Sequence, residues 1–506
     1  MQYVTLFFFV KLARGLTVIR RAIEMEKRRL IAAVVILLCI CIAASAAETA
    51  ASPIVAGNEA IKQPTLTDMF HNPTPWLEMG ADARFREHAG YNWTGLDNDQ
   101  VYNGKSDNNW HWQRYRLRWW TKAKLDEDND INTRMTWEFR TYDLPPSKDQ
   151  STDFDEIIID NLNWTSRNIF DSSATLILGR QDIKLGEGWL VADGTPVDGS
   201  RTFYFDAARV SYDLREKTKL DLIYVDQHPN SDWFLKPIND RNKYVTQQQE
   251  HGAILYLTDK TFEPTQFEGY FIYKNDNPVD TPARNFSSGS ISKFSRKAEI
   301  FTFGGAVSGA ISSNWNYRVE GAIQGGSAAG PASSNIGTTE QLRAFGQKSN
   351  LEYCFKDPKD NKVHVTYEYL SGDDPGTTRV ESFSPLWGEW PQWSELYQPY
   401  ITSLEDNQVS NLHRVAFGHK FKPNTKWEIM TDYHLLWADQ NTYRGTSKFT
   451  NSGNFRGHLL TCWARYNFTK HFKGNLVGEY FLPGSYYASG NRDNALYFHF
   501  TIEYLF

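Results

Sequence analysis

The chain has 506 residues, of which 41% are hydrophobic and 15% aromatic, and its formal net charge is -6 at pH 7. Beyond the N-terminus it has no run of about 20 apolar residues, which excludes spanning helices from the mature chain. A transmembrane β-barrel needs only half of each strand to be apolar, so a mean hydropathy of -0.55 with many aromatic residues is the composition expected of a barrel.

The first element is the apolar run Leu30–Ala44, which follows Met25 and the basic Lys27-Arg28-Arg29. Small residues end the run, as at a cleavage site, and this pattern predicts a secretory signal peptide. A membrane anchor is the weaker alternative, because the run is short and no stop-transfer charge cluster follows it. We expect four segments: an upstream extension or mis-assigned start at 1–24, the signal peptide at 25–47, a short periplasmic segment at 48–74, and a barrel at 75–506.

Alternation of apolar and polar residues predicts about eighteen strands in the rest of the chain. Their expected ranges are 75–87, 110–124, 131–142, 154–165, 173–181, 205–213, 217–226, 249–258, 265–274, 296–310, 313–325, 342–356, 361–372, 409–421, 425–438, 455–468, 472–483 and 493–506. The last strand places six large apolar residues on one face and stops on an aromatic residue, Phe506. The fold class is therefore all-β, a transmembrane antiparallel β-barrel of the bacterial outer membrane.

The connections between these strands alternate between long and short. His88–Asn109 and Asp373–Gln408 are examples of long ones, whereas Leu125–Asp130 and Lys422–Asn424 are short. Outer-membrane barrels have short periplasmic turns and longer extracellular loops, and an even strand number returns both termini to the periplasm. We therefore expect a cell outer-membrane protein of the Gram-negative type, in contact with outer-membrane lipid and with both termini periplasmic.

Arginines recur on the face opposite the apolar one in the first strands, and this face would line the lumen. The residues are Arg84, Arg86, Arg114, Arg116, Arg118, Arg134 and Arg140. Alternation around Arg180 is too weak to fix its face. Forked guanidinium groups in a narrow aqueous channel bind carboxylates, so the pattern predicts an anion path. The alternative is that lumenal acids neutralise these arginines.

The longest loop, Asp373–Gln408, contains Trp387, Trp390 and Trp393 together with several prolines. Such a composition suits an ordered lid or constriction. A surface loop held by aromatic packing is the alternative, since long loops are commonly either functional or disordered.

Several blocks resemble the bacterial alginate export family. They are Leu178-Gly179-Arg180-Gln181, Leu185-Gly186-Glu187-Gly188-Trp189, Arg201-Thr202-Phe203, Phe205-Asp206-Ala207, Arg465-Tyr466 and Phe481-Leu482-Pro483-Gly484. Members of that family are eighteen-stranded outer-membrane barrels that let anionic alginate leave the cell. The resemblance implies a lumen that selects a polyuronate, gated by long loops or periplasmic segments, and it adds Arg201 to the residues expected to contact carboxylates. The family's acidic residue is missing near Gly457, and the substrate stays open between poly- and oligosaccharides.

Other functions fit less well. A general or small-anion porin working in uptake shares every feature except the resembling blocks and remains the main alternative. No Ser-His-acid spacing predicts a catalytic residue, and no cofactor or metal site is expected. Nucleic acid is not an expected partner, because the basic residues would lie inside a barrel, whereas periplasmic secretion or scaffold proteins are expected partners.

Overall fold

The computed structural model describes residues 70–97, 101–102, 105–106, 108–146, 152–192, 204–229, 235–239, 246, 248–278, 296–330, 337–388, 391–397 and 409–506. The chain divides into two compact units, Met1–Gly80 and Ala81–Phe506. The expected upstream extension and signal peptide lie outside the described residues. In the first unit, His71 Nδ1 lies 2.9 Å from the carbonyl oxygen of Met79. Over the described part of the chain, no helix has the length and apolar character needed to cross a bilayer.

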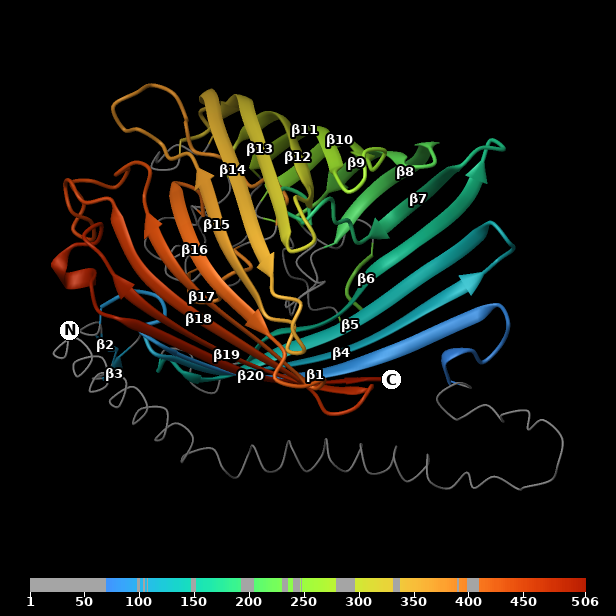
Figure 1. Cartoon of the computed structure of the whole chain (residues 1–506), viewed down its shortest axis with the longest axis horizontal. Helices are drawn as coiled ribbons and strands as arrows, with labels where there is room; N and C mark the ends of the chain where they lie inside the picture. The colour runs from blue at the N-terminus through green and yellow to red at the C-terminus, as the bar shows by residue number, and fades with distance from the viewer. Residues whose placement is uncertain are drawn as a thin grey trace. The chain divides into compact units, whose positions relative to one another are not determined.

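The second unit is a closed antiparallel β-barrel of eighteen strands (Figure 1). Its strands are β1 (Leu77–Tyr91), β4 (Trp110–Lys124), β5 (Asn129–Leu144), β6 (Thr152–Ile169), β7 (Ala174–Gln181), β8 (Phe205–Arg215), β9 (Thr218–Gln227), β10 (Gln248–Asp259), β11 (Gln266–Pro278), β12 (Ala298–Ala310), β13 (Trp315–Ala328), β14 (Glu340–Cys354), β15 (Lys362–Leu370), β16 (Leu412–Phe421), β17 (Trp427–Trp437), β18 (Phe455–Asn467), β19 (Phe472–Pro483) and β20 (Ala495–Leu505). Two short strands, β2 (Val101–Tyr102) and β3 (Lys105–Ser106), pair with each other in the first long connection. A 3-10 turn, η2 (Ser489–Asn491), precedes the last strand.

Each strand pairs with its neighbours in the sequence, and the first strand closes the ring by pairing with the last. The register of that closure sets Arg84 opposite Glu503 and Arg86 opposite Thr501. Closure leaves no unpaired sheet edge, which is what a spanning sheet requires in lipid. The predicted fold is confirmed, and so is the count of eighteen strands; strand ends differ from the prediction by a few residues.

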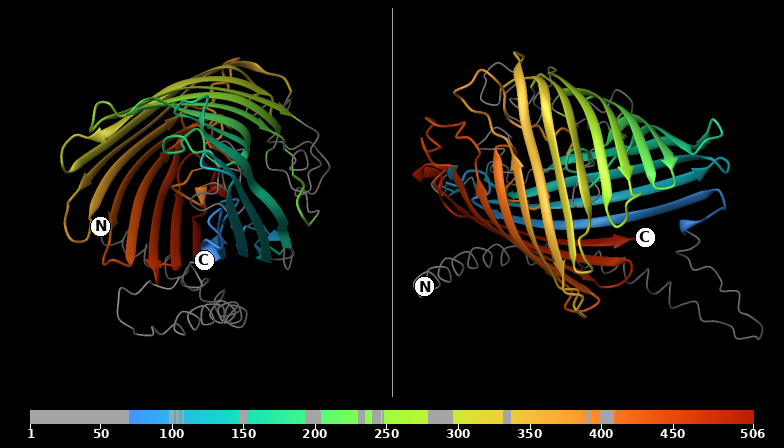
Figure 2. Two further views of the ribbon diagram at one scale, coloured as in Figure 1. Left: turned by 90° about the vertical axis from the view of Figure 1, so that its right-hand side faces the viewer. Right: turned by 45° about the horizontal axis from the view of Figure 1, so that its top comes forward.

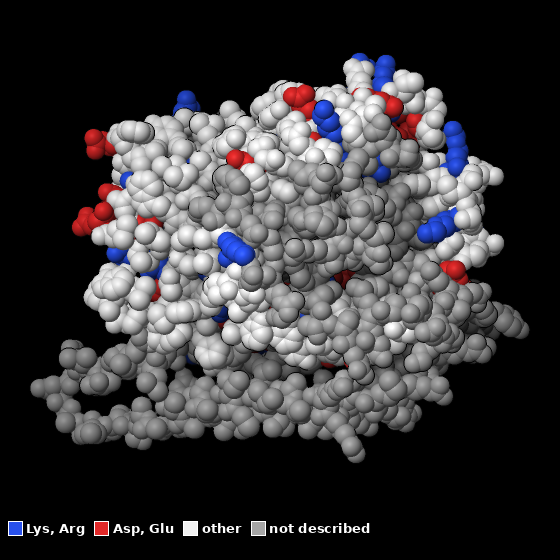
Figure 3. Space-filling model, turned by 180° about the vertical axis from the view of Figure 1, so that it is seen from behind, with Lys and Arg blue, Asp and Glu red and all other residues white. Residues whose placement is uncertain are grey.

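The alternating pattern separates two faces of the barrel wall. Outward side chains are large and apolar: Leu117 and Trp119 on β4 are each 46% exposed, and Ile323 on β13 is 58% exposed. Inward positions are polar and largely buried. In Figure 3 many of the charged side chains in view stand toward the left and right margins of the white surface. Large apolar side chains on the outward face are what the hydrocarbon core of a bilayer selects.

The two ends of the barrel differ in the length of their connections. Residues 125–128 join β4 to β5, 216–217 join β8 to β9, and 468–471 join β18 to β19. At the other end lie the connections at 182–204 and 371–411. We name these the short-turn end and the long-loop end. Figure 2 shows the strands slanting around the wall between them, and β1 begins and β20 finishes at the short-turn end.

Candidate functional site

Arginines gather on one stretch of the lumen wall, where β1, β4 and β5 are neighbours. Alternation turns every second side chain of these strands inward. The inward set contains Arg84 and Arg86 from β1, Arg114, Arg116 and Arg118 from β4, and Arg134 and Arg140 from β5. Because these strands are adjacent, residues spread over the sequence stand together on one wall. We call the six residues other than Arg134 the arginine wall.

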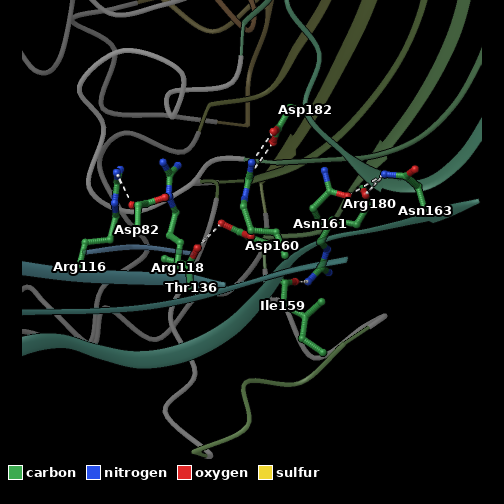
Figure 4. Close-up of polar contacts among 11 residues, drawn as sticks. Asp82, Arg116, Arg118, Thr136, Ile159, Asp160, Asn161, Asn163, Arg180 and Asp182 are labelled. Atoms are coloured by element: carbon green, nitrogen blue, oxygen red, sulfur yellow. Dashed lines mark hydrogen bonds and ion pairs between the residues drawn. The ribbon is translucent and has the colours of Figure 1, made fainter. Parts of the chain in front are cut away.

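Acidic side chains hold part of this wall in place (Figure 4). Asp82 accepts hydrogen bonds from Arg116 Nη2 at 3.0 Å and from Arg118 Nε at 2.7 Å. Arg116 also pairs with Glu503 of β20 at 2.9 Å. Both Asp82 and Arg116 are buried, at 4% and 5% exposure. Such charge-assisted bonds fix guanidinium groups that would otherwise repel one another.

Glu138 forms ion pairs with two other members of the arginine wall, Arg114 and Arg140. Its Oε1 lies 3.5 Å from Arg114 Nη2 and 3.7 Å from Arg140 Nε. In the described part of the chain, three carboxylates, Asp82, Glu138 and Glu503, form ion pairs with Arg114, Arg116, Arg118 and Arg140. Six inward arginines and these acids thus share one stretch of wall inside a largely enclosed space.

Arg134 and Arg180 belong to a different cluster. Arg134 donates to Asp160 at 2.9 Å and makes a bidentate pair with Asp182 at 2.6 and 2.8 Å. Arg180 makes a second bidentate pair, at 2.9 and 3.2 Å, with Asp206 of the neighbouring strand. Two acids on Arg134 and one bidentate acid on Arg180 leave little positive field for a passing anion, so these arginines fix the start of the loop that follows β7.

A backbone irregularity sets the direction of Arg180. Gly179 has φ +120°, a conformation that L side chains rarely adopt, and it interrupts the alternation of β7. Leu178 therefore faces outward with 49% exposure, while Arg180 faces inward with 1% exposure. Arg201, expected from the family resemblance, lies outside the described residues.

The connection between β15 and β16 enters the barrel. We call its described residues, 371–388 and 391–397, the strap. Trp387 Nε1 donates a hydrogen bond of 2.6 Å to Glu250, an inward residue of β10. Gln324, an inward residue of β13, exchanges two bonds of 2.8 Å with the strap backbone. Since both partners face the lumen, this part of the strap lies inside the channel.

The strap is anchored again on the far side of the lumen. Glu479 of β19 accepts three hydrogen bonds from it: from Ser394 Oγ at 2.5 Å, from the Glu395 backbone N–H at 2.8 Å and from the Leu396 backbone N–H at 3.0 Å. In the ring of eighteen strands, β19 stands nine places after β10, where Trp387 is held. The two anchors are on opposite sides of the barrel, so the strap crosses the channel and narrows it.

A second loop supports the strap. Val191 and Trp387 form a parallel bridge, in which Ala192 N–H donates to Trp387 O at 2.8 Å and Trp387 N–H donates to Leu190 O at 3.0 Å. The structure therefore places Trp387 within the lumen, as the constriction hypothesis requires. Trp393 is also inside, 5.2 Å from the ring of His434, whereas Trp390 lies outside the described residues.

The strap also presents a charge to the arginine wall. Glu395 lies within electrostatic reach of Arg86 and Arg114. Its backbone N–H donates to Glu479 at 2.8 Å, which keeps Glu395 near these two arginines. Glu395 therefore competes for the arginine wall while the strap is in place.

The base of the strap is tied to the next long loop by Asp439. Asp439 Oδ2 accepts the Gly372 backbone N–H at 2.9 Å, and His413 Nε2 lies 3.2 Å from its Oδ1. Burial by itself would raise the pKa of Asp439, but the hydrogen bond to His413 and the one from Gly372 outweigh burial and hold that pKa below its ordinary value of 3.8.

Sequence reasoning missed the strap anchors, Glu250 and Glu479. Their inward position could be read from alternation, but nothing in the sequence shows that a loop would meet them. Within the described ranges there is no group of three His, Cys, Asp or Glu side chains placed to hold a metal ion. Cys354 and Cys462 are both free thiols.

Comparison with known proteins gives one family. The family model described as alginate export matches residues 75–498. No curated protein matches the chain.

Solved structures with a similar fold are bacterial porins of low sequence identity. Pseudomonas aeruginosa OccK2 (OpdF), solved in complex with glucuronate, is 11% identical with a TM-score of 0.49, over 84% of this chain and 97% of that one. P. aeruginosa OccK8 (OprE) is 10% identical with a TM-score of 0.49, over 85% and 98%. A BenF-like porin from Pseudomonas fluorescens Pf-5 is 8% identical with a TM-score of 0.48, over 84% and 98%.

Proposed function

Because the chain belongs to the alginate export family, we propose that this outer-membrane channel passes anionic poly- or oligosaccharide by passive diffusion along its arginine wall. The observation that carries the proposal is the gathering of six inward arginines on the wall of β1, β4 and β5, with the carboxylates Asp82, Glu138 and Glu503 among them. A sugar carboxylate entering the lumen can exchange with these acids at small cost, since one guanidinium–carboxylate pair replaces another.

The orientation follows from the general architecture of such barrels. Short turns are periplasmic and long loops extracellular, so we assign the short-turn end and both termini to the periplasm. The anionic chain would then enter between the short turns and leave past the strap. Periplasmic secretion or scaffold proteins would meet the channel at the short-turn end.

The rest of the lumen wall supports a localised path. Arg318 on β13 pairs with Glu268 and Glu320, each at 2.7 Å, and Arg414 on β16 pairs with Glu368 at 2.9 Å. Cations on these strands are matched by acids. An anion would therefore follow the wall of β1, β4 and β5, where the inward arginines are concentrated.

The test is the reversal potential of the refolded protein in planar bilayers under a salt gradient. The double variant R114E/R118E inverts two charges of the arginine wall, and we expect anion selectivity to fall or reverse. The matched control is R215E, which reverses the charge of an exposed arginine at the end of β8, beside the turn at 216–217. An unchanged reversal potential in R114E/R118E would refute the role of the arginine wall.

A small-anion porin is the second candidate, and the strap is the observation that favours it. A segment crossing the lumen between Glu250 and Glu479 lets small solutes pass but must move aside for a polymer. Oligouronate that blocks the current and crosses into liposomes supports the polysaccharide channel. Passage of small anions without block by oligouronate supports the porin.

A further inference from the structure

A cavity of about 170 Å³ lies in the lumen wall between β1 and the last three strands. This volume is large enough for several water molecules or for one small polar solute. The charged part of its lining consists of Arg84, Arg86, Arg465, Lys473 and Glu503. Four cations therefore face one acid, and the cavity lies outside the part of the lumen that the strap crosses.

The single acid is already engaged. Glu503 pairs with Arg116 at 2.9 Å, so the cavity shares the charge of this acid with the arginine wall. Arg86 donates its Nε–H to Thr501 Oγ1 at 2.9 Å, which fixes that guanidinium. Arg465 pairs with Glu428 at 3.1 Å in an exposed position, where an ion pair is weak and exchangeable.

Two polar groups that line the cavity can each bind a group of a ligand. Lys473 is exposed to the lumen, and within the described part of the chain it makes no hydrogen bond or ion pair. The amide oxygen of Asn475, two residues along the same face, is buried without a hydrogen-bond partner. A buried acceptor without a partner is costly. A ligand that offers a carboxylate to Lys473 and a hydroxyl to Asn475 satisfies both groups at once.

An aromatic side chain completes the cavity. Trp463 lines it with a ring that is 7% exposed, and the guanidinium carbon of Arg465 lies 5.9 Å from the centre of that ring. Sugars combine apolar C–H faces with hydroxyl edges, so a tryptophan wall opposite polar groups suits a sugar better than an inorganic anion.

The cavity is near the short-turn end. Lys473 follows directly on the turn at 468–471, whose Lys470 is exposed, and the turn between β16 and β17 carries exposed Lys422 and Lys426. By contrast, the turn between β4 and β5 carries Asp126, Glu127 and Asp128. Lys422 pairs with Asp360 at 2.8 Å, which leaves Lys426, Lys470 and Lys473 as positive charges on the β17–β19 side of the mouth, where they attract an anion.

We propose that this cavity is a loading site that binds one carboxylated sugar residue of a chain arriving at the short-turn end, before the arginine wall. The inference rests on the proposed function and adds the point and direction of entry. Lys473 and Arg465 bind the carboxylate of the sugar, and the amide oxygen of Asn475 accepts a hydrogen bond from one of its hydroxyl groups. Arg86 belongs both to the cavity and to the arginine wall.

The experiment measures block of the ion current through the refolded full chain by glucuronate, acetate or glucose, added to one side of a planar bilayer at a time. Glucuronate should block from one side, acetate more weakly because it lacks the hydroxyls, and neutral glucose hardly at all. The variants K473Q and N475L should each weaken glucuronate block about tenfold, the effect of one lost charged or polar contact. The matched control, K348Q on β14, should leave the block unchanged.

Equal block in wild type, K473Q and N475L, or equal block from both sides, would overturn the loading site. Equal block by acetate and glucuronate would overturn the sugar contacts. The reversal potential, measured on the same membranes, separates this inference from the proposed function. If K473Q and N475L leave glucuronate block unaltered while the channel remains anion-selective, the loading site is refuted and the role of the arginine wall is not. Heat-modifiable migration of each variant on gels confirms that the barrel has folded.

Discussion

Truncating the far anchor of the strap, in the variant E479A, should open the channel. The carboxylate of Glu479 accepts three hydrogen bonds from the strap, at 2.5, 2.8 and 3.0 Å. Hydrogen bonds to charged groups contribute about 1.5–3 kcal/mol each, and the burial of the carboxylate offsets several kcal/mol of their sum. A net loss of roughly 3 kcal/mol corresponds to about a hundredfold larger population of the detached strap.

The assay is single-channel recording, in which E479A should show a larger mean conductance and more frequent transitions than the wild type. The matched control is E352A, which removes a lumenal carboxylate of β14 that pairs with Lys362 at 3.5 Å and does not contact the strap. Thermal unfolding separates a local effect from a global one, because the closed barrel does not depend on the strap. A conductance trace identical to that of the wild type would show that Glu479 does not hold the constriction.

Three further changes test the same geometry. E395Q removes the acid that faces the arginine wall, so anion selectivity in the reversal potential should rise, and a fall would contradict the competition described above. G252A places a methyl group 2.1 Å from the Trp387 ring, so the part of the strap that is held at Glu250 must shift. Open-channel noise should therefore increase. Unchanged noise would mean that the ring moves aside without disturbing the strap. The pKa of Asp439 in the folded protein lies below its ordinary value of 3.8. Its carboxylate therefore stabilises the base of the strap fully above pH 3.8, and this stabilisation is lost as the pH falls from 3.8 through the pKa of the folded protein. Single-channel recordings at falling pH should show new gating events, which the variant D439N should already show at pH 7.

The sequence predicts the barrel well because the physics of a spanning strand is local. Lipid on one side and water on the other impose a period of two on every strand, and this period identifies the strands and which side chains face outward. The outward face of β4, with Leu117 and Trp119, and the aromatic face of the last strand follow from this alone. Loop lengths then give the even strand count. Each of these properties depends on residues that are neighbours in the sequence.

The site depends on pairings that are distant in the sequence. The arginine wall could be located, but the partners of its members could not, because Glu503 reaches Arg116 only after the last strand has closed on the first. The inward direction of Arg180 depends on the positive φ of Gly179, where the alternation itself fails. Arg134 follows the alternation and still has a structural role, since Asp160 and Asp182 occupy both sides of its guanidinium.

The strap shows how the closed ring gives a loop its function. A loop rich in tryptophan and proline is compatible with a lid, a constriction or a surface loop, and its composition does not choose among them. The choice is made by Glu250 and Glu479, which hold acceptors on opposite walls at a spacing that only the closed ring of eighteen strands creates. Both acceptors are carboxylates, and the strap stabilises them through neutral N–H and O–H donors without removing their charge. Anchoring the constriction also holds Glu395 within electrostatic reach of Arg86 and Arg114, so the same contacts that narrow the channel weaken the field of the arginine wall.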